Sequence, residues 1–359
     1  MPRLAIEQWE QEHRRHVRQF VDAIDGLYED AIEEMVRLGI TYDYDGAKGK
    51  LFAFSANKAK QAEADSIIAS FREKLNTIIT VGISTEWVFA NEKNDSWVRK
   101  LFENPQEGYM LHNLKALEAF QGRKIYGHSL SERVWQYSKQ FKGYMEMALS
   151  VGLTEGRSAV SLSRDVRSQL KNPDKLFRRV RNRFGDLVLS RNAQNFHPGQ
   201  GVYRSSYQNA MRMARTEINM AYRESDYVRW QQLDFIVGVE VKTSKSHEAW
   251  LAKEWNPRFK KGLPPPKEVC DALKGRYPKD FKFIGWHPNC KCYTVPILAN
   301  EDSDKDWWEG ADNEITEAPA QFERWMKDND ERIQKAIERG KAPYWVVENE
   351  KYSKVDIKK

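Results

Sequence analysis

The chain has 359 residues, of which 40% are hydrophobic and 12% aromatic, enough apolar material for the cores of two or three domains. Charged residues make up 31%, which favours long solvated helices over a single globule. No apolar run approaches the length of a membrane span, and no apolar segment resembles a secretory signal, so neither is expected.

Residues 1–150 predict an all-helical module. Apolar residues recur there at three- and four-residue spacing, which is typical of helices with one buried face. The pattern predicts long helices over 6–39, 57–81 and 133–149, and shorter ones over 86–102 and 111–120.

Residues 151–234 predict a basic helical connector followed by a long helix. Thr154 is the expected N-cap of the first helix in this segment. An Asn-Pro-Asp break at 172–174 separates it from a second basic helix. The long helix is expected over 203–229, with Ala214, Ile218 and Ala221 in its buried stripe.

The connector carries the strongest positive charge of the chain, with ten basic and three acidic residues between 157 and 191 and a net charge of +7. Lysine and arginine neutralise phosphates whatever the base sequence, so these side chains are candidates for binding a nucleic acid or an acidic partner. The alternative is a solvated helix face. The candidates are Arg157, Arg164, Arg167, Lys171, Lys175, Arg178, Arg179, Arg181, Arg183 and Arg191.

Residues 235–300 predict a small mixed α+β domain with a few short strands, expected over 235–241, 281–284 and 292–298. Residues 301–359 predict an acidic C-terminal tail with one helix, because 16 acidic residues outnumber 11 basic ones. The predicted fold class is therefore α+β, with a predominantly helical N-terminal part.

The C-terminal part also gathers every cysteine of the chain. Cys270, Cys290 and Cys292 lie within 23 positions, and His287 precedes Cys290 by three residues. Zinc prefers four sulfur or imidazole ligands in a tetrahedron, and small domains that lack core are often held together by such an ion. The four residues therefore predict a structural zinc site. Two alternatives remain: the cysteines are small buried hydrophobes, or His247 replaces His287 as a ligand.

Three stretches resemble a known family. They are R-S-S-Y-Q-N-A-M-R-M-A-R-T-E-I-N-M-A-Y at 204–222, C-D-A-L-K-G-R-Y-P from Cys270, and W-H-P-N-C-K-C-Y-T-V-P-I-L from Trp286. In this order they resemble the C-terminal domain of the phage Mu F-like minor head proteins, over about 155–298. Relatives look as if they carry C-x2-C-D at the first cysteine position, where this chain has P-K-E-V-C-D with Cys270 alone.

The resemblance implies a non-catalytic minor head protein of a phage or prophage that acts in head morphogenesis. It implies association with the portal protein, other head proteins and the packaged double-stranded DNA, in several copies per virion. The expected location is the head or neck of the virion, after assembly in the bacterial cytoplasm.

Two other functions stay open from the sequence. One is an enzyme, a toxin-like nuclease or ADP-ribosyltransferase carried by a head-protein module, with acid–base and phosphate-binding groups at Arg215, Glu217, His247 and His287. The other is a free DNA-binding regulator. The acidic tail is short for a toxin domain, and no base-reading motif is evident.

Overall fold

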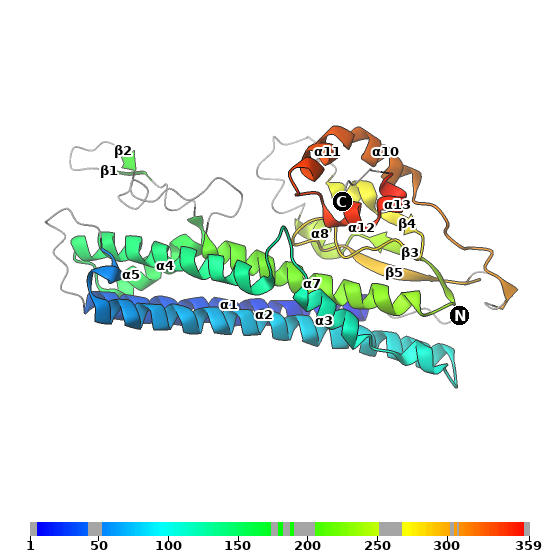
Figure 1. Cartoon of the computed structure of the whole chain (residues 1–359), viewed down its shortest axis with the longest axis horizontal. Helices are drawn as coiled ribbons and strands as arrows, with labels where there is room; N and C mark the ends of the chain where they lie inside the picture. Colours follow the sequence, from blue (N-terminus) through cyan, green and yellow to red (C-terminus); the bar gives the residue numbers. More distant parts are fainter. Residues whose placement is uncertain are drawn as a thin grey trace. The chain divides into compact units, whose positions relative to one another are not determined.

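The structure is a computed structural model that describes residues 6–41, 52–173, 179–181, 187–189, 205–250, 268–301, 305–306 and 309–354. Helices dominate, and a three-stranded antiparallel sheet lies in the C-terminal part (Figure 1). The α+β fold class predicted from the sequence is therefore confirmed. Of the described helices, none combines the length and the apolar character that crossing a membrane requires.

The N-terminal part and the connector are built from long helices. Two short 3-10 turns, η2 (Phe54–Ala56) and η3 (Glu107–Met110), lie among them. Residues 57–81 and 86–102, predicted as separate helices, form one continuous helix, α2. The helices are α1 (Ile6–Ile40), α2 (Lys58–Leu101), α3 (Leu114–Gly122), α4 (Leu130–Thr154), α5 (Ala159–Lys171) and α7 (Ser206–Gln231).

The connector differs from its prediction in two places. Thr154 is the last residue of α4, and the side chain of Ser158 caps α5 by accepting from the Ser161 N–H at 3.3 Å. The prediction of a basic helix after the Asn-Pro-Asp break is wrong for the residues that the structure describes there. They form two strands instead, β1 (Arg179–Arg181) and β2 (Leu187–Leu189), which pair antiparallel. Three-residue strands are too short to leave a hydrophobic period in the sequence.

The chain forms two compact units, each assembled from separate stretches. One comprises Met1–Val17, Gly82–Tyr126 and Arg215–Lys359, and is called unit 1 here. Unit 2 comprises Arg18–Val81 and Gly127–Ala214. The helices α1, α2 and α7 contribute residues to both. The division into four consecutive segments stays a prediction.

The core of unit 2 contains a cluster of aromatic side chains around Tyr28. The ring of Tyr28 lies 4.8 Å from that of Phe71 and 5.3 Å from those of Phe141 and Tyr207, each in an edge-to-face arrangement. Such pairs are favourable beyond the area they bury. The stripe of aromatic residues along these helices is therefore packing material.

In unit 1 the helices α1, α2 and α7 meet through charged side chains instead. Arg223 of α7 donates to both carboxylate oxygens of Glu10 at 2.6 and 2.5 Å. Lys93 of α2 donates to Asp226 at 2.5 Å and to the Tyr222 hydroxyl at 3.0 Å. All five side chains are buried. Because an unpaired buried charge is costly, these pairs fix how the three helices align.

The sheet of unit 1 has the order β4-β3-β5, with β3 (Ile236–Lys242) in the centre. β4 (Gly275–Tyr277) and β5 (Tyr293–Leu298) pair antiparallel with it on either side. The strands predicted over 235–241 and 292–298 are thus confirmed. The third predicted strand, 281–284, is wrong: these residues are irregular although Phe281, Phe283 and Ile284 are buried.

The acidic tail packs into the core of unit 1. Phe322, Met326 and Trp345 belong to the same apolar cluster as Tyr277 and Cys292. Figure 1 shows these helices in orange and red beside the sheet. The short helices of this part are α8 (Lys245–Trp250), α9 (Val269–Leu273), α10 (Ala320–Asp328), α11 (Asp330–Glu338), α12 (Tyr344–Glu348) and α13 (Glu350–Ser353).

Candidate metal centre

Three structural elements of unit 1 bring the cysteines together. Cys270 lies on α9, Cys290 ends a turn, and Cys292 directly precedes β5. All three thiols are free and buried, and their sulfur atoms lie within 4.8 Å of one another. The sulfurs of Cys270 and Cys290 are 3.9 Å apart. Two sulfurs bonded tetrahedrally to one zinc ion lie about 3.8 Å apart, so this spacing suits a shared metal ion.

His287 supplies a fourth donor atom. Its Nε2 lies 3.0 Å from the sulfur of Cys270, and its Nδ1 lies 2.8 Å from the carbonyl oxygen of Pro288. A carbonyl only accepts, so Nδ1 carries the hydrogen and the Nε2 lone pair faces the sulfur. Metal-binding histidines are typically oriented in this way by a backbone carbonyl. Of the four predicted ligands, the three cysteines therefore converge, whereas His287 contacts Cys270 from outside the group of sulfurs.

The turn that carries His287 and Cys290 is held against α7. The Cys290 N–H donates to the His287 carbonyl at 3.0 Å, and Asn289 adopts a left-handed conformation with φ of 61°. From α7, the Thr216 hydroxyl accepts from the Asn289 N–H at 3.1 Å, and Asn219 donates to the Cys290 carbonyl at 3.4 Å. The turn is thus fixed by contacts that do not depend on a metal ion.

The three thiols do not ionise equally. Burial raises the pKa of Cys290, but hydrogen bonds from Cys270 and Cys292, with His287 nearby, outweigh burial and lower it well below the ordinary value. Hydrogen bonding to Cys290 and Cys292, followed by burial, raises the pKa of Cys270. A thiolate that accepts hydrogen bonds from neighbouring thiols is a suitable starting state for metal binding. Binding of the metal then releases the protons of those thiols.

Gly285 allows the turn to approach Cys290. Its φ is +130°, and a β-carbon there would lie 3.1 Å from the Cys290 Cβ. We expect Gly285→Ala to cost about 1–3 kcal/mol in backbone strain and to weaken metal affinity by displacing Cys290. A chelator competition titration measures the affinity.

Gly310→Ala is the matched control for that variant. Gly310 also has a positive φ, +92°, but open space surrounds the position of its missing β-carbon. It should lower stability without changing metal affinity. Equal metal affinity in the two variants would contradict the packing role of Gly285.

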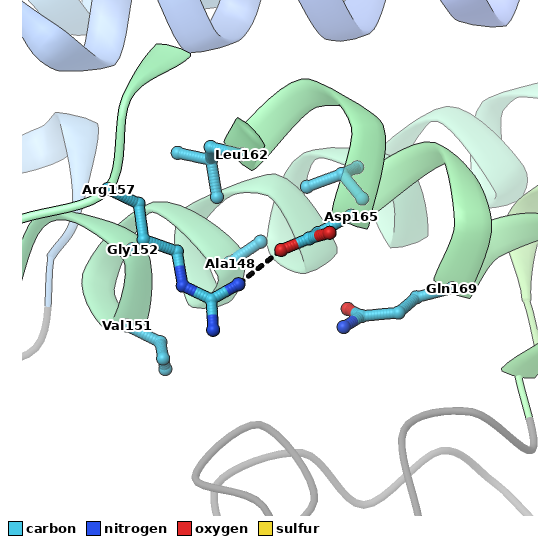
Figure 2. A pocket seen from close by; sticks show the side chains of 8 residues that line it. Ala148, Val151, Gly152, Arg157, Leu162, Asp165 and Gln169 are labelled. Atoms are coloured by element: carbon cyan, nitrogen blue, oxygen red, sulfur yellow. Dashed lines mark hydrogen bonds and ion pairs between the residues drawn. The ribbon is translucent and has the colours of Figure 1, made fainter. Parts of the chain in front are cut away.

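The basic candidates of the connector are largely engaged within unit 2. Arg157 pairs with Glu155 at 2.8 Å and with Asp165, as Figure 2 shows for the second pair. The other contacts are Arg167 with Glu29 at 3.4 Å and Glu33 at 3.3 Å, and Lys171 with Asp25 at 2.8 Å.

Arg164 is the most exposed of these four basic side chains, at 75%. Lys175, Arg178, Arg183 and Arg191 lie outside the described residues, as do the side chains of Arg179 and Arg181. Binding of a nucleic acid by this segment therefore stays a prediction.

Arg157 and Asp165 also line a pocket between α4 and α5 (Figure 2). Its walls are mostly apolar, and it has room for about one water molecule, far less than a small-molecule site needs. Among the residues that line the pocket, Arg157 and Asp165 are the only charged ones, and they are paired with each other.

The residues considered for an enzyme have separate local partners. The buried carboxylate of Glu217 accepts from Arg123 at 2.7 Å. His247, also buried, lies 3.6 Å from Asp271, whereas His287 faces Cys270. Arg215 is exposed on α7. Sequence reasoning missed the buried charges of Glu10, Lys93, Arg223 and Asp226, although charged residues at three-residue spacing in 223–229 were a visible signal.

Comparison with protein-family models, with curated proteins and with solved structures gave no match to the chain. The function of the site therefore has to be inferred from its own side chains.

Proposed function

We propose that the chain is a non-catalytic minor head protein of a phage or prophage, and that a structural zinc ion holds its C-terminal α+β part together. The proposed ligands are Cys270, His287, Cys290 and Cys292. The observation that carries the metal site is the convergence of three buried sulfurs within 4.8 Å, with the imidazole Nε2 of His287 3.0 Å from one of them.

The ligand set favours zinc and a structural role. Thiolate and imidazole are the donors of structural zinc sites, whereas calcium and magnesium require oxygen ligands. Four protein ligands complete a tetrahedron and leave no position for water or substrate. The chain's own part is to orient His287 through Pro288 and to hold the Cys290 turn on α7 through Thr216 and Asn219.

The role in head morphogenesis is supported by the motifs at 204–222 and from Cys270 to Leu298. In the structure these motifs form α7, α9, the cysteine turn and β5, and the three clustered cysteines lie on α9 and in the segment that leads into β5. We place the portal protein and other head proteins first among the partners, because all four described basic candidates of the connector have a carboxylate of unit 2 as an ion-pair partner, the exposed Arg164 at the longest distance of 3.8 Å.

Elemental analysis of the purified full-length protein tests the metal. We expect about one zinc per chain, and a loss of that zinc in Cys290→Ser. His112→Asn is a suitable control, because His112 pairs with Asp95 away from the cluster. Protein without bound metal, whose folding is also unchanged in Cys290→Ser, would exclude the site.

Particles purified from the producing bacterium test the head role. We expect the protein to sediment with particles in a constant ratio to the portal protein, and particle yield to fall when its gene is deleted. Quantitative mass spectrometry of gradient fractions measures the ratio. Normal heads in the deletion strain, together with absence of the protein from wild-type particles, would refute the role.

A further inference from the structure

A buried hydroxyl lies beside the metal centre. The side-chain oxygen of Tyr344, at the start of α12, is buried, and none of the described residues accepts a hydrogen bond from it. Buried polar groups in native proteins are nearly always hydrogen-bonded, so such an oxygen needs an explanation. Its surroundings provide one.

Gly285 locates the hydroxyl relative to Cys290. A β-carbon on Gly285 would lie 3.8 Å from the Cys290 sulfur and 3.8 Å from the Tyr344 oxygen. The sulfur and the hydroxyl therefore both lie next to the position that a side chain at residue 285 would occupy. A neutral phenol can donate one hydrogen bond, and a thiolate can accept it.

The charge of the metal-bound site creates the need for such a donor. Three thiolates carry one more negative charge than a divalent ion neutralises. Hydrogen bonds to the sulfurs of a metal–thiolate site disperse that charge and hold the ligands in position. The Trp286 backbone already hydrogen-bonds Cys290. The remaining environment of Cys290 is mostly apolar, because it belongs to the cluster with Phe283, Trp286 and Trp345.

We infer that Tyr344 is a positioning residue of the metal centre, whose hydroxyl donates a hydrogen bond to the Cys290 thiolate when metal is bound. The inference rests on the proposed metal site. It ties the tail to that site, because Trp345, the next residue, donates from Nε1 to the Trp286 carbonyl at 3.0 Å. Metal binding and docking of α12 then reinforce each other.

Cobalt(II) titration of full-length Tyr344→Phe tests the inference, since this variant keeps the ring and loses the hydroxyl. We expect affinity to fall about 10-fold or more, the range typical for outer ligand partners. The thiolate-to-cobalt charge-transfer band should also shift, because the sulfur loses a hydrogen bond. A purely structural role for Tyr344 would leave that band unchanged.

Tyr352→Phe is the matched control, because the Tyr352 hydroxyl donates to Asp280 at the surface of the same tail. It should match the wild type in affinity and spectrum. Wild-type protein that binds no cobalt would refute the metal site itself. If the wild type binds cobalt and Tyr344→Phe shows the same affinity and the same charge-transfer band, only the role of Tyr344 is refuted.

If Tyr344→Phe does not fold, the wild-type protein still decides the question. With the tyrosines labelled with ¹³C at Cζ, one resonance should shift on metal addition. An unchanged tyrosine spectrum on metal binding would overturn the inference.

Discussion

Removing the metal is expected to lower the unfolding temperature of the C-terminal α+β part substantially. A ligand that binds only the folded state stabilises it by about 4 kcal/mol at a thousandfold excess over its Kd. Among the described residues, the sheet of unit 1 has three short strands, two of them at the edges, so it depends on the tail and the cysteine turn for closure. Thermal unfolding with and without chelator measures the effect.

Cys290→Ser should unfold at the temperature of the chelated wild type and show no further change when chelator is added. His112→Asn should retain the full response to chelator, because His112 contacts Asp95 rather than the cluster. Identical unfolding of wild-type protein with and without chelator would show that the cysteines pack without a metal ion.

Breaking the Glu10–Arg223 pair is expected to be the most destabilising single substitution among the charged residues. Glu10→Gln leaves the guanidinium of Arg223 buried without its counter-ion, a change that typically costs about 3–5 kcal/mol. Denaturant unfolding of Glu10→Gln beside the wild type measures this cost. The exposed pair of Glu12 and Arg15 on the same helix is the control, and Glu12→Gln should cost less than about 1 kcal/mol.

The same carboxylate makes stability depend on pH. Burial alone raises the pKa of Glu10, but the charge and hydrogen bonds of Arg223 outweigh it and lower the pKa from 4.5 to about 2. Because the folded-state pKa is the lower one, the contribution is complete above pH 4.5 and is lost as the pH falls towards 2. It amounts to about 3 kcal/mol.

The pH dependence separates charge from packing. Glu10→Gln should lose less stability than the wild type between pH 5 and 2, because it has no carboxylate to protonate there. Parallel acid-unfolding curves for the two proteins would show that Glu10 does not carry the effect.

Hydrophobic pattern predicted the elements that bury apolar faces. The helix at 6–40 and the strands β3 and β5 have such faces, and their predictions are confirmed to within a few residues. The cluster of three cysteines could be found because cysteine is rare in this chain and the three lie close together in the sequence. Composition and spacing alone were enough for these features.

The continuity of α2 could not be predicted for a physical reason. The predicted break falls at 82–85, Gly-Ile-Ser-Thr, residues of low helix propensity. Beyond it, the buried face of α2 includes polar residues, among them Asn91, Lys93 and Asn94. Their partners lie on α7, for example Asp226, which accepts from Asn94 at 2.9 Å. A face that is satisfied by distant charges has no hydrophobic period, so the apolar stripe of 57–81 does not continue into 86–102, and the weak helix formers between them indicate a break.

The irregular stretch at 281–284 shows the opposite error. Its apolar side chains are buried as those of a strand would be, which is why a strand was predicted. Its backbone is satisfied by a side chain instead: Asn349 accepts from the Lys282 N–H at 2.7 Å and donates to the Lys282 carbonyl at 2.9 Å. Alternating apolar residues indicate burial, whereas strand pairing requires a neighbouring backbone.

The interleaved order of the two units has a consequence for biosynthesis. Every residue of unit 2 has been polymerised once the ribosome passes residue 214, whereas the core of unit 1 waits for Trp345 and Asn349. Units of a nascent chain fold as their segments become complete. Until then, the thiols of Cys270, Cys290 and Cys292 remain without the tail that covers them, so newly made chains pass through a period in which these sulfurs are open to oxidants and competing metals.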